Sequence, residues 1–455
     1  MRGSAMSDLP TPIGDLLPSI RASGPGGDAT RTLVDLLANS ECPGLTARRR
    51  RREELTGSSH DPIVWAVARG ANVVDVDGNR YVDMTGGFGV ALLGHGVPEV
   101  VAAVQSQAST LLHALGDVYP SAKKILLEGR LAALAPWPAR VILGLSGADA
   151  VEAALKTAML ATGRPGVLAF EGGYHGLSYG ALAACGYKLA FREPFAGQLN
   201  PAVRFAPYPS AAGSGRAMEY VEAVLAEGRT GALLIEPTLG RGGVEPAAEG
   251  SLATLTAMAR RHGALLVADE IYTGLGRTGG MFQSIAMEGD PDVLVIGKAL
   301  GGGLPISAAI IKEDVAAAWG HPVGEAIHTS TFLGNPLACA AAIASLEVLQ
   351  RPDTAAMIAR CAASLERSLR SSLRSPGLGV RRMTFAGVLV GVAINGGLRR
   401  ALAVCRSMLE RGYVMLTGGV AGDVLTLTPP ACLTEAQIED FCANLAGVLA
   451  ESPDP

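Results

Sequence analysis

The chain has 455 residues, of which 49% are hydrophobic and 18% charged, enough material for a large buried core and more than one ordinary domain. A formal net charge of −4 and an isoelectric point near 6.0 argue against a broad electrostatic grip on nucleic acid. The one basic run, ARRRRREE at 47–54, ends in two glutamates and is interpreted as a solvated helix face rather than a nucleic-acid patch.

The N-terminal segment lacks the features of a signal peptide, because Asp8 and two prolines interrupt the apolar run that one needs. No stretch reaches the ~18–20 uncharged apolar residues of a membrane span. The seven cysteines are scattered, odd in number and without a CxxC pair, which is typical of reduced thiols and not of a disulfide framework or a metal site. We therefore expect a cytoplasmic enzyme that engages neither a membrane nor a metal.

Residues 1–30 are rich in Pro, Gly and Ser, and we expect a flexible or docking N-terminal arm there. The stretch ANVVDVDGNRYVD at 71–83 predicts a hairpin, because two short β-rich runs flank the turn pair Asp77-Gly78. Residues 31–99 are assigned to the N-terminal part of a small domain.

Residues 100–345 predict a large domain in which strands and helices alternate. The predicted strands are short apolar runs, and the clearest helices lie between them. Strands are expected at 140–146, 166–171, 231–237, 263–270 and 292–298, and helices at 149–162 and 251–263. This alternation favours an open α/β sheet with mostly parallel strands, in which ligands bind at the carboxyl ends of the strands.

Residues 346–455 predict a second, smaller α+β domain that residues 31–99 complete. A helix is expected from about 343, a strand at 387–394 and a final helix from about 434.

The turn Ser146-Gly147-Ala148 joins a predicted strand to a helix for which Asp149 is the expected cap. A helix N-terminus offers unpaired N–H groups and a positive dipole end, and small residues let a phosphate approach. An ordinary strand–helix turn is the alternative. After the next strand, Tyr174 and His175 stand among glycines, where an aromatic ring can cover a planar ligand or merely plug a turn.

Asp269 and Lys298 end two consecutive predicted strands, so parallel β-units bring them to the same edge of the sheet. A structural carboxylate that pairs with Arg277 and a snorkelling lysine are the alternatives, but the apolar neighbours of Lys298 disfavour the second. An amine beside an anion suits pyridoxal phosphate, whose aldehyde forms a Schiff base with lysine and whose pyridinium nitrogen needs an acidic partner.

The motifs SGADAVEAALK, YHG, IEP, DEIYTGLGRTG, GKALGGGLP and HTSTFLGNPLACAAA occur in this order. Together they make the chain resemble the class-III pyridoxal-phosphate-dependent aminotransferases of fold type I, from about residue 60 to about residue 445. The resemblance implies amino transfer between an amine and a carbonyl compound, and a homodimer with shared active sites.

The resemblance also implies roles for individual residues. Lys298 would form the Schiff base and carry the reacting proton, Asp269 would bind the pyridine nitrogen, and Thr331 would bind the phosphate of the neighbouring subunit's cofactor. The implied cofactor-binding set is Ser146, Gly147, Ala148, Tyr174, His175, Glu236, Asp269, Tyr272, Lys298 and Thr331.

The substrate is indicated by departures from the family pattern. Family members that bind an α-carboxylate commonly have arginine where this chain has Thr426, and threonine cannot provide the forked, charged grip of a guanidinium. Tyr272 and Leu239 stand where glutamines are common, and Ile271 where valine is. We therefore expect a polyhydroxylated or basic amine, such as an amino sugar of an aminoglycoside antibiotic pathway. Phe88 is a further candidate for the substrate pocket, with a plain core role as the alternative.

Two other functions stay open at this point. A racemase or epimerase on the same scaffold would return the proton to the other face of the substrate carbon, and Thr426 does not separate it from an aminotransferase. A non-catalytic relic of the fold is disfavoured by the intact pair Asp269 and Lys298.

Overall fold

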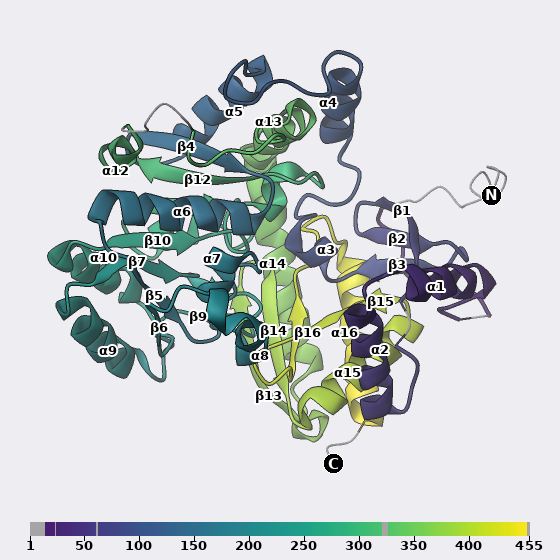
Figure 1. Cartoon of the computed structure of the whole chain (residues 1–455). Coiled ribbons are helices and arrows are strands. Elements are labelled where there is room, and N and C mark those ends of the chain that lie inside the picture. Colours follow the sequence, from purple (N-terminus) through teal and green to yellow (C-terminus); the bar gives the residue numbers. More distant parts are fainter. Residues whose placement is uncertain (1–13, 23, 61, 321–325, 453–455) are drawn as a thin grey trace. The chain divides into compact units, whose positions relative to one another are not determined.

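The computed structural model describes residues 14–22, 24–60, 62–320 and 326–452 (Figure 1). The chain divides into two compact units, one made of Met1–Val97 with Met357–Pro455 and the other of Pro98–Ala356. Residues 1–13 of the expected N-terminal arm lie outside the described residues. The arm's next residues pack on their own unit, since Ser19 pairs with the backbone of Arg80.

The second unit is built on a seven-stranded sheet with the order β4-β12-β11-β10-β7-β5-β6. Only β12 runs antiparallel to its neighbours, and the other neighbouring strands pair in parallel. The strands are β4 (Ala139–Gly144), β5 (Gly166–Phe170), β6 (Val203–Ala206), β7 (Thr230–Ile235), β10 (Leu265–Asp269), β11 (Val293–Ile296) and β12 (Ser307–Lys312). The expected open, mostly parallel α/β sheet is confirmed.

Helices cover both faces of this sheet. Successive residues of a strand point to opposite faces, so each strand packs against helices on both sides. On one face, Ala232 and Leu234 of β7 pack against α6 (Gly147–Thr162). On the other, Leu233 and Ile235 pack against α9 (Ser214–Ala226) and α10 (Ser251–His262). Figure 1 shows α6 crossing the sheet on one side and α9 and α10 on the other. Burial on both faces explains why these strands are continuous apolar runs.

All five predicted strands of this sheet are present, but its strands β6 and β12 were not predicted. Strand β6 has only four residues and lies at the sheet edge, where Ala206 is its one buried residue. Strand β12 follows the glycine-rich segment after Lys298 and returns antiparallel between β11 and β4.

The remaining elements of the second unit include α13, which is almost wholly buried and packs against α4 and α5. They are α4 (Pro98–Ala108), α5 (Ala122–Ala132), α7 (Tyr179–Ala183), α8 (Leu189–Arg192), β8 (Thr238–Leu239), β9 (Glu245–Pro246), α11 (Gln283–Ala286), α12 (Glu313–Ala316) and α13 (Pro336–Leu349), with α14 (Pro352–Ser372) beginning here and continuing into the first unit.

The first unit contains two four-stranded sheets, ordered β1-β2-β3-β15 and β13-β14-β17-β16. The predicted hairpin is confirmed, with β2 antiparallel to β3 and Gly78 at φ +83° in the turn between them. The basic run lies in α2, which has no buried residue. The elements are α1 (Asp28–Ser40), α2 (Pro43–Thr56), β1 (Trp65–Arg69), β2 (Asn72–Asp75), β3 (Arg80–Asp83), α3 (Gly86–Gly89), β13 (Val380–Ala386), β14 (Leu389–Ile394), α15 (Gly397–Glu410), β15 (Tyr413–Val414), β16 (Leu416–Gly418), β17 (Val424–Leu427) and α16 (Glu435–Glu451).

None of the helices in the described part of the chain combines the length and the apolarity needed to cross a membrane. Within the same residues, no group of three His, Cys, Asp or Glu side chains is placed to hold a metal ion.

Candidate active site

Lys298 follows the carboxyl end of β11 and begins a short 3-10 turn. Its φ of +40° lies in the left-handed region that residues with a side chain rarely adopt, so the turn holds it at a conformational cost. Burial lowers the pKa of the Lys298 amine to about 8, although the charges of Asp269 and Glu236 act in the opposite direction. Near pH 8 a large share of this amine is neutral and able to act as a nucleophile.

Asp269 ends β10, the parallel neighbour of β11. Its Oδ2 atom lies 2.7 Å from Nδ1 of His175, and its Oδ1 accepts the backbone N–H of Ile271 at 3.1 Å. Burial acts to lower the pKa of His175, but the hydrogen bond and charge of Asp269, with the charge of Glu236, outweigh it and raise the pKa overall. Each carboxylate oxygen of Asp269 therefore has a donor inside the protein.

Glu236 follows β7 and connects two loops. Its Oε1 accepts the backbone N–H of Tyr174 at 2.8 Å, and its Oε2 accepts that of Gly240 at 2.9 Å. Burial raises its pKa to about 7, and the charge of Asp269 adds to the shift while His175 opposes it. Glu236 thus fixes the Tyr174 loop beside the Gly240 loop.

The N-terminus of α6 follows the edge strand β4. The expectation that Asp149 caps this helix is wrong: Ser146 is the N-cap, and Asp149 completes a capping box by accepting the Ser146 N–H. An acidic residue suits this third helical position, because its carboxylate reaches back to accept the backbone N–H groups of Leu145 and Ser146. The cap uses an oxygen lone pair of Ser146, so its hydroxyl hydrogen stays available, as do backbone N–H groups of the first turn.

Ile271 closes the space between this helix and the strand ends. A Cβ atom on Gly147 would lie 2.7 Å from Cδ1 of Ile271, and one on Gly297 would lie 3.6 Å from Cγ2 of the same side chain. A Cβ on Gly176 would lie 2.6 Å from Cβ of Ala148. Glycine is therefore required at 147 and 176 for the helix terminus, the His175 turn and the strand ends to approach this closely.

Tyr272 lies against the Lys298 amine, whose Nζ is 3.9 Å from the centroid of the tyrosine ring. Gly240 also approaches this side chain closely, since a Cβ atom there would lie 2.9 Å from Cγ of Tyr272. Tyr174 makes an edge-on contact with Tyr187, with ring centroids 6.2 Å apart. The guanidinium carbon of Arg241 lies 4.3 Å from the centroid of the Tyr174 ring.

The structure thus brings together nine of the predicted site residues in the second unit, through direct contacts or contacts across one neighbour. They are Ser146, Gly147, Ala148, Tyr174, His175, Glu236, Asp269, Tyr272 and Lys298. Thr331 belongs to the same unit and lies in an exposed segment before α13.

Phe88 and Thr426 lie in the first unit. Phe88 is 66% exposed and has φ +62°, and its loop packs on the end of β17, since a Cβ atom on Gly86 would lie 2.5 Å from the carbonyl oxygen of Thr428. The hydroxyl of Thr428 donates to the carbonyl of Thr85 at 2.6 Å. The core role considered for Phe88 is therefore wrong, and the two substrate candidates come from adjoining segments.

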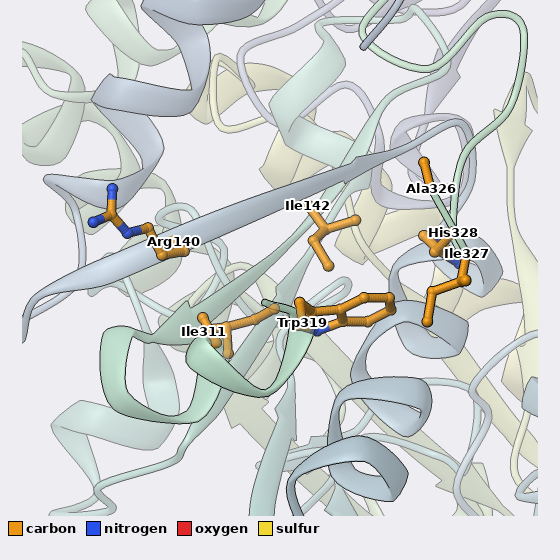
Figure 2. A pocket seen from close by; sticks show the side chains of 8 residues that line it. Arg140, Ile142, Ile311, Trp319, Ala326, Ile327 and His328 are labelled. Carbon is orange, nitrogen blue, oxygen red and sulfur yellow. The ribbon is translucent and has the colours of Figure 1, made fainter. Parts of the chain in front are cut away.

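A cavity of about 280 Å³ lies elsewhere in the second unit, at the edge strand β4 (Figure 2). Ile142 and Ile311 form part of its wall, and the ring of Trp319 lies beside them while its Nε1 donates to Thr157. No residue of the predicted site is among the described residues that line it. This cavity is therefore separate from the Lys298 group.

The residues around Lys298 fit pyridoxal phosphate. They provide a nucleophilic amine, a carboxylate with fixed orientation, and helix N–H groups suited to a phosphate. The Nε2 atom of His175 is buried and has no hydrogen-bond partner among the described residues, which marks a polar position that a ligand can satisfy. Tyr174 contributes an aromatic face.

Comparison with known proteins agrees with a site for pyridoxal phosphate. A model of the family described as aminotransferase class-III matches residues 56–449. An acetylornithine aminotransferase of Methanothermobacter thermautotrophicus is 35% identical, with 86% of this chain and 95% of the relative covered. One from Mycobacterium leprae is 37% identical, with 86% and 92% covered.

Solved structures agree with this result. A PLP-bound amine transaminase from an uncultivated Pseudomonas species superimposes with a TM-score of 0.79 and 26% identity, covering 86% of this chain and 95% of that one. A Bacillus anthracis aminotransferase gives a TM-score of 0.80 at 23% identity, covering 90% and 100%, and supports the fold alone. The protein has the fold of type I pyridoxal-phosphate enzymes. It belongs to the class-III aminotransferase family and is a pyridoxal-phosphate-dependent aminotransferase.

Two residues beside the site were missed in the sequence. Arg241 stands in EPTLGRGGV, a single charge among glycines, and that contrast is the signal that could have singled it out. Tyr187 gave no such signal, because its place beside Tyr174 depends on the loop between α7 and α8.

Proposed function

We propose that the side chains gathered around Lys298 perform the amino transfer, with the roles that the family resemblance assigns to them. The observation that carries this proposal is the neighbouring position of Asp269 and Lys298 at the ends of two parallel strands. Pyridoxal phosphate, when bound, supplies an electron sink for the carbon that bears the transferred amino group.

Lys298 acts through its Nζ atom, first as nucleophile and then as the carrier of the reacting proton. A pKa of about 8 suits both tasks, because the amine can take up and release a proton near neutral pH. Tyr272, whose ring faces this amine, limits the directions in which Nζ can move.

Asp269 holds a negative charge where the pyridine nitrogen would bind. His175 and the Ile271 N–H orient the carboxylate, so His175 is a positioning residue in this proposal. Ser146, Gly147 and Ala148 bind the phosphate through the α6 N-terminus, and Tyr174 covers the ring.

A homodimer with shared sites is supported by an apolar surface of the second unit. The segment before α5 lies against the segment before α13, since Asn335 donates to the carbonyl of Leu112 at 3.1 Å and the rings of His113 and Phe332 are 5.4 Å apart. Exposed large apolar side chains gather there: Leu111, Leu112, Leu115, Val118, Tyr119 and Phe332. A patch of this kind is typical of an interface. Thr331 lies within it, exposed and available to a partner's cofactor.

The principal amine substrate is proposed to be an amine that needs no arginine at position 426. Thr426 lies in the middle of β17, with 7% of its surface exposed, and carries no charge. A basic or polyhydroxylated amine such as an amino sugar meets this condition, although the names of the relatives give an aminoglycoside substrate no support. Acetylornithine is the second candidate, because it is the substrate that those names state.

The test is a panel of amino donors that includes acetylornithine, L-alanine, 1-phenylethylamine and an amino sugar, each followed by the cofactor spectrum with and without a keto acid. Preference for an amine without an α-carboxylate supports the first candidate, and preference for acetylornithine supports the second. Exchange of the substrate hydrogen with deuterated water, without net amino transfer, would instead support the epimerase considered from the sequence. The absorbance band of the lysine-bound cofactor must be lost in Lys298→Ala if the assignment of Lys298 is right.

A further inference from the structure

Arg241 is held above two aromatic rings at the edge of the Lys298 group. Its guanidinium carbon lies 4.3 Å from the centroid of Tyr174 and 5.1 Å from that of Tyr187, and the residue is partly buried. Rings that face a guanidinium attract it through their π-electrons. The N–H groups of a guanidinium point outward in its own plane, so contacts to its face leave them free to donate.

No carboxylate of the described residues forms an ion pair with Arg241. Many other arginines of the chain do, for example Arg130 with Glu347 and Arg204 with Glu227, both at the surface. A partly buried arginine held by rings and without an anionic partner has its charge available for a ligand.

Arg241 is also connected to the reacting amine. It follows Gly240, which abuts the ring of Tyr272 on which the Lys298 amine lies. Glu236 binds the N–H groups of both Gly240 and Tyr174, so the backbone that carries Arg241 and the ring beneath it are fixed together. The charge of Arg241 contributes to the lowered pKa of Lys298, as expected for a cation near this amine.

We propose that Arg241 binds the carboxylate of the keto-acid acceptor, and equally that of the amino acid formed from it. This inference rests on the proposed function, because it assumes that Tyr174 and Lys298 flank the reacting centre. The carboxylate of the keto acid would then be bound by the Gly240–Gly242 loop. In this chain Thr426 replaces the arginine that is common in the family and could otherwise bind it. A forked guanidinium matches a carboxylate with two parallel hydrogen bonds.

The experiment compares two acceptors that differ in charge, pyruvate and butanal, with the best amine from the donor panel. Arg241→Met should raise KM for pyruvate about 10- to 100-fold, the loss expected for a charge-assisted hydrogen bond, and should leave KM for butanal within about threefold. Arg241→Lys should restore part of the pyruvate affinity, because it keeps the charge but not the fork.

Equilibrium binding gives a second measurement. Propionate resembles pyruvate without its reactive carbonyl, and calorimetric titration of the holoenzyme with propionate should show binding that Arg241→Met abolishes. Arg192→Met is the matched control, because it also removes an arginine from an aromatic ring, here Phe205 at 4.1 Å, without altering the Lys298 group. Propionate binding and both KM values should survive in this control.

The outcomes separate this inference from the proposed function. If Arg241→Met keeps the cofactor spectrum and leaves KM for pyruvate unchanged, the inference about Arg241 is wrong and the proposed function stands. An equal loss of kcat with both acceptors, with propionate binding intact, would show that Arg241 merely holds Tyr174, which overturns the inference as well. Arg241→Gln provides a second neutral variant if the methionine variant does not fold. A wild-type protein without a cofactor spectrum would instead contradict the proposed function.

Discussion

The Nδ1 atom of His175 lies 2.7 Å from the Oδ2 atom of Asp269, and both side chains are almost completely buried. The two residues are 94 positions apart in the sequence, and the fold brings the loop after β5, which carries His175, to the end of β10, where Asp269 lies. Because the Ile271 N–H binds the other oxygen, the carboxylate of Asp269 is fixed in orientation.

Asp269→Asn should keep the protein folded but lower kcat by roughly 10²–10³-fold, the cost of removing one preorganised charge from an active site. The asparagine side chain has nearly the same shape and cannot carry the negative charge that a protonated pyridine nitrogen needs. The measurement is the steady-state rate at saturating pyridoxal phosphate, together with the cofactor spectrum.

Asp292→Asn is the matched control for this prediction. Asp292 precedes β11, and its Oδ2 accepts the Leu266 N–H at 2.9 Å at the opposite end of the same strand pair. Its amide variant should lose some stability and retain kcat. Equal losses of kcat in both variants would mean that Asp269 serves only the stability of the sheet.

The Lys298 amine should titrate near pH 8 in the cofactor-free protein. Only the neutral amine attacks an aldehyde, and the neutral fraction grows as the pH rises through the pKa. The rate of cofactor incorporation should therefore increase from pH 6 and level off above about pH 9, with its midpoint near 8. Stopped-flow mixing of the apoprotein with pyridoxal phosphate measures this rate.

Glu236→Gln should move this midpoint to lower pH. The negative charge of Glu236 raises the pKa of Lys298, so its removal favours the neutral amine. Glu128→Gln is the control, because Glu128 is a half-buried acid of the same unit that pairs with Lys124. A midpoint that stays near 8 in Glu236→Gln would contradict the electrostatic account of the Lys298 amine.

Gly147→Ala should weaken cofactor binding, because the new Cβ atom would lie 2.7 Å from Cδ1 of Ile271. Overpacking of this kind costs ~1–3 kcal/mol, which corresponds to a loss of affinity of about 5- to 150-fold if it falls on the phosphate site. Ile271→Val removes the clashing Cδ1 atom, so the double variant should recover most of the affinity. Fluorescence titration with pyridoxal phosphate measures the dissociation constant.

Gly129→Ala controls for the effect of adding a methyl group to a helical glycine. Gly129 lies inside α5, and a Cβ there meets nothing within 4 Å. Its alanine variant should bind the cofactor normally. If Ile271→Val fails to rescue Gly147→Ala, the contact between these two side chains is not what requires glycine at position 147.

Subunit mixing tests whether Thr331 serves the neighbouring site. Lys298→Ala and Thr331→Ala homodimers should each be impaired, but a mixed dimer contains one site with both residues intact. Activity should therefore rise above that of either homodimer when the two impaired variants are unfolded and refolded together. Leu115→Asp places a charge in the apolar patch and should yield monomers in sedimentation experiments, whereas Leu36→Asp, at an exposed position of α1, should not. Absence of activity in mixed dimers that do form would contradict shared sites.

The sequence predicts the parts of the site that depend on local pattern. Asp269 and Lys298 stand at the ends of apolar runs, and Ser146 stands between a strand and a helix, so strand periodicity alone places them at one sheet edge. Strand β12 was not predicted. Its place and its antiparallel direction depend on pairing with β4 and β11, which its own residues do not reveal.

Arg241 and Tyr187 were missed for a related reason. Their role depends on contacts between the loops that follow β5 and β7 and the loop before α8. These loops meet only in the folded chain. Position 426 is the opposite case, because the identity of this one residue, threonine in place of the arginine common in the family, predicts the class of substrate without reference to the fold.

Thr426→Arg tests whether position 426 sets the preference for substrates without an α-carboxylate. Thr426 pairs with Gly391 on β14 and Leu416 on β16, and its Oγ1 has no hydrogen-bond partner among the described residues. A guanidinium at this position should lower KM for L-alanine and L-glutamate, because it offers two charge-assisted hydrogen bonds to an α-carboxylate. The variant should also be less stable without substrate, since a buried arginine without an anion is costly. Thermal unfolding with and without L-glutamate measures this cost and its relief.

Thr426→Val is the control: it keeps the shape, removes an unpaired hydroxyl, and should alter neither KM. If Thr426→Arg folds and both KM values equal those of the valine variant, position 426 does not face the substrate, and the preference for an amine without an α-carboxylate loses its basis.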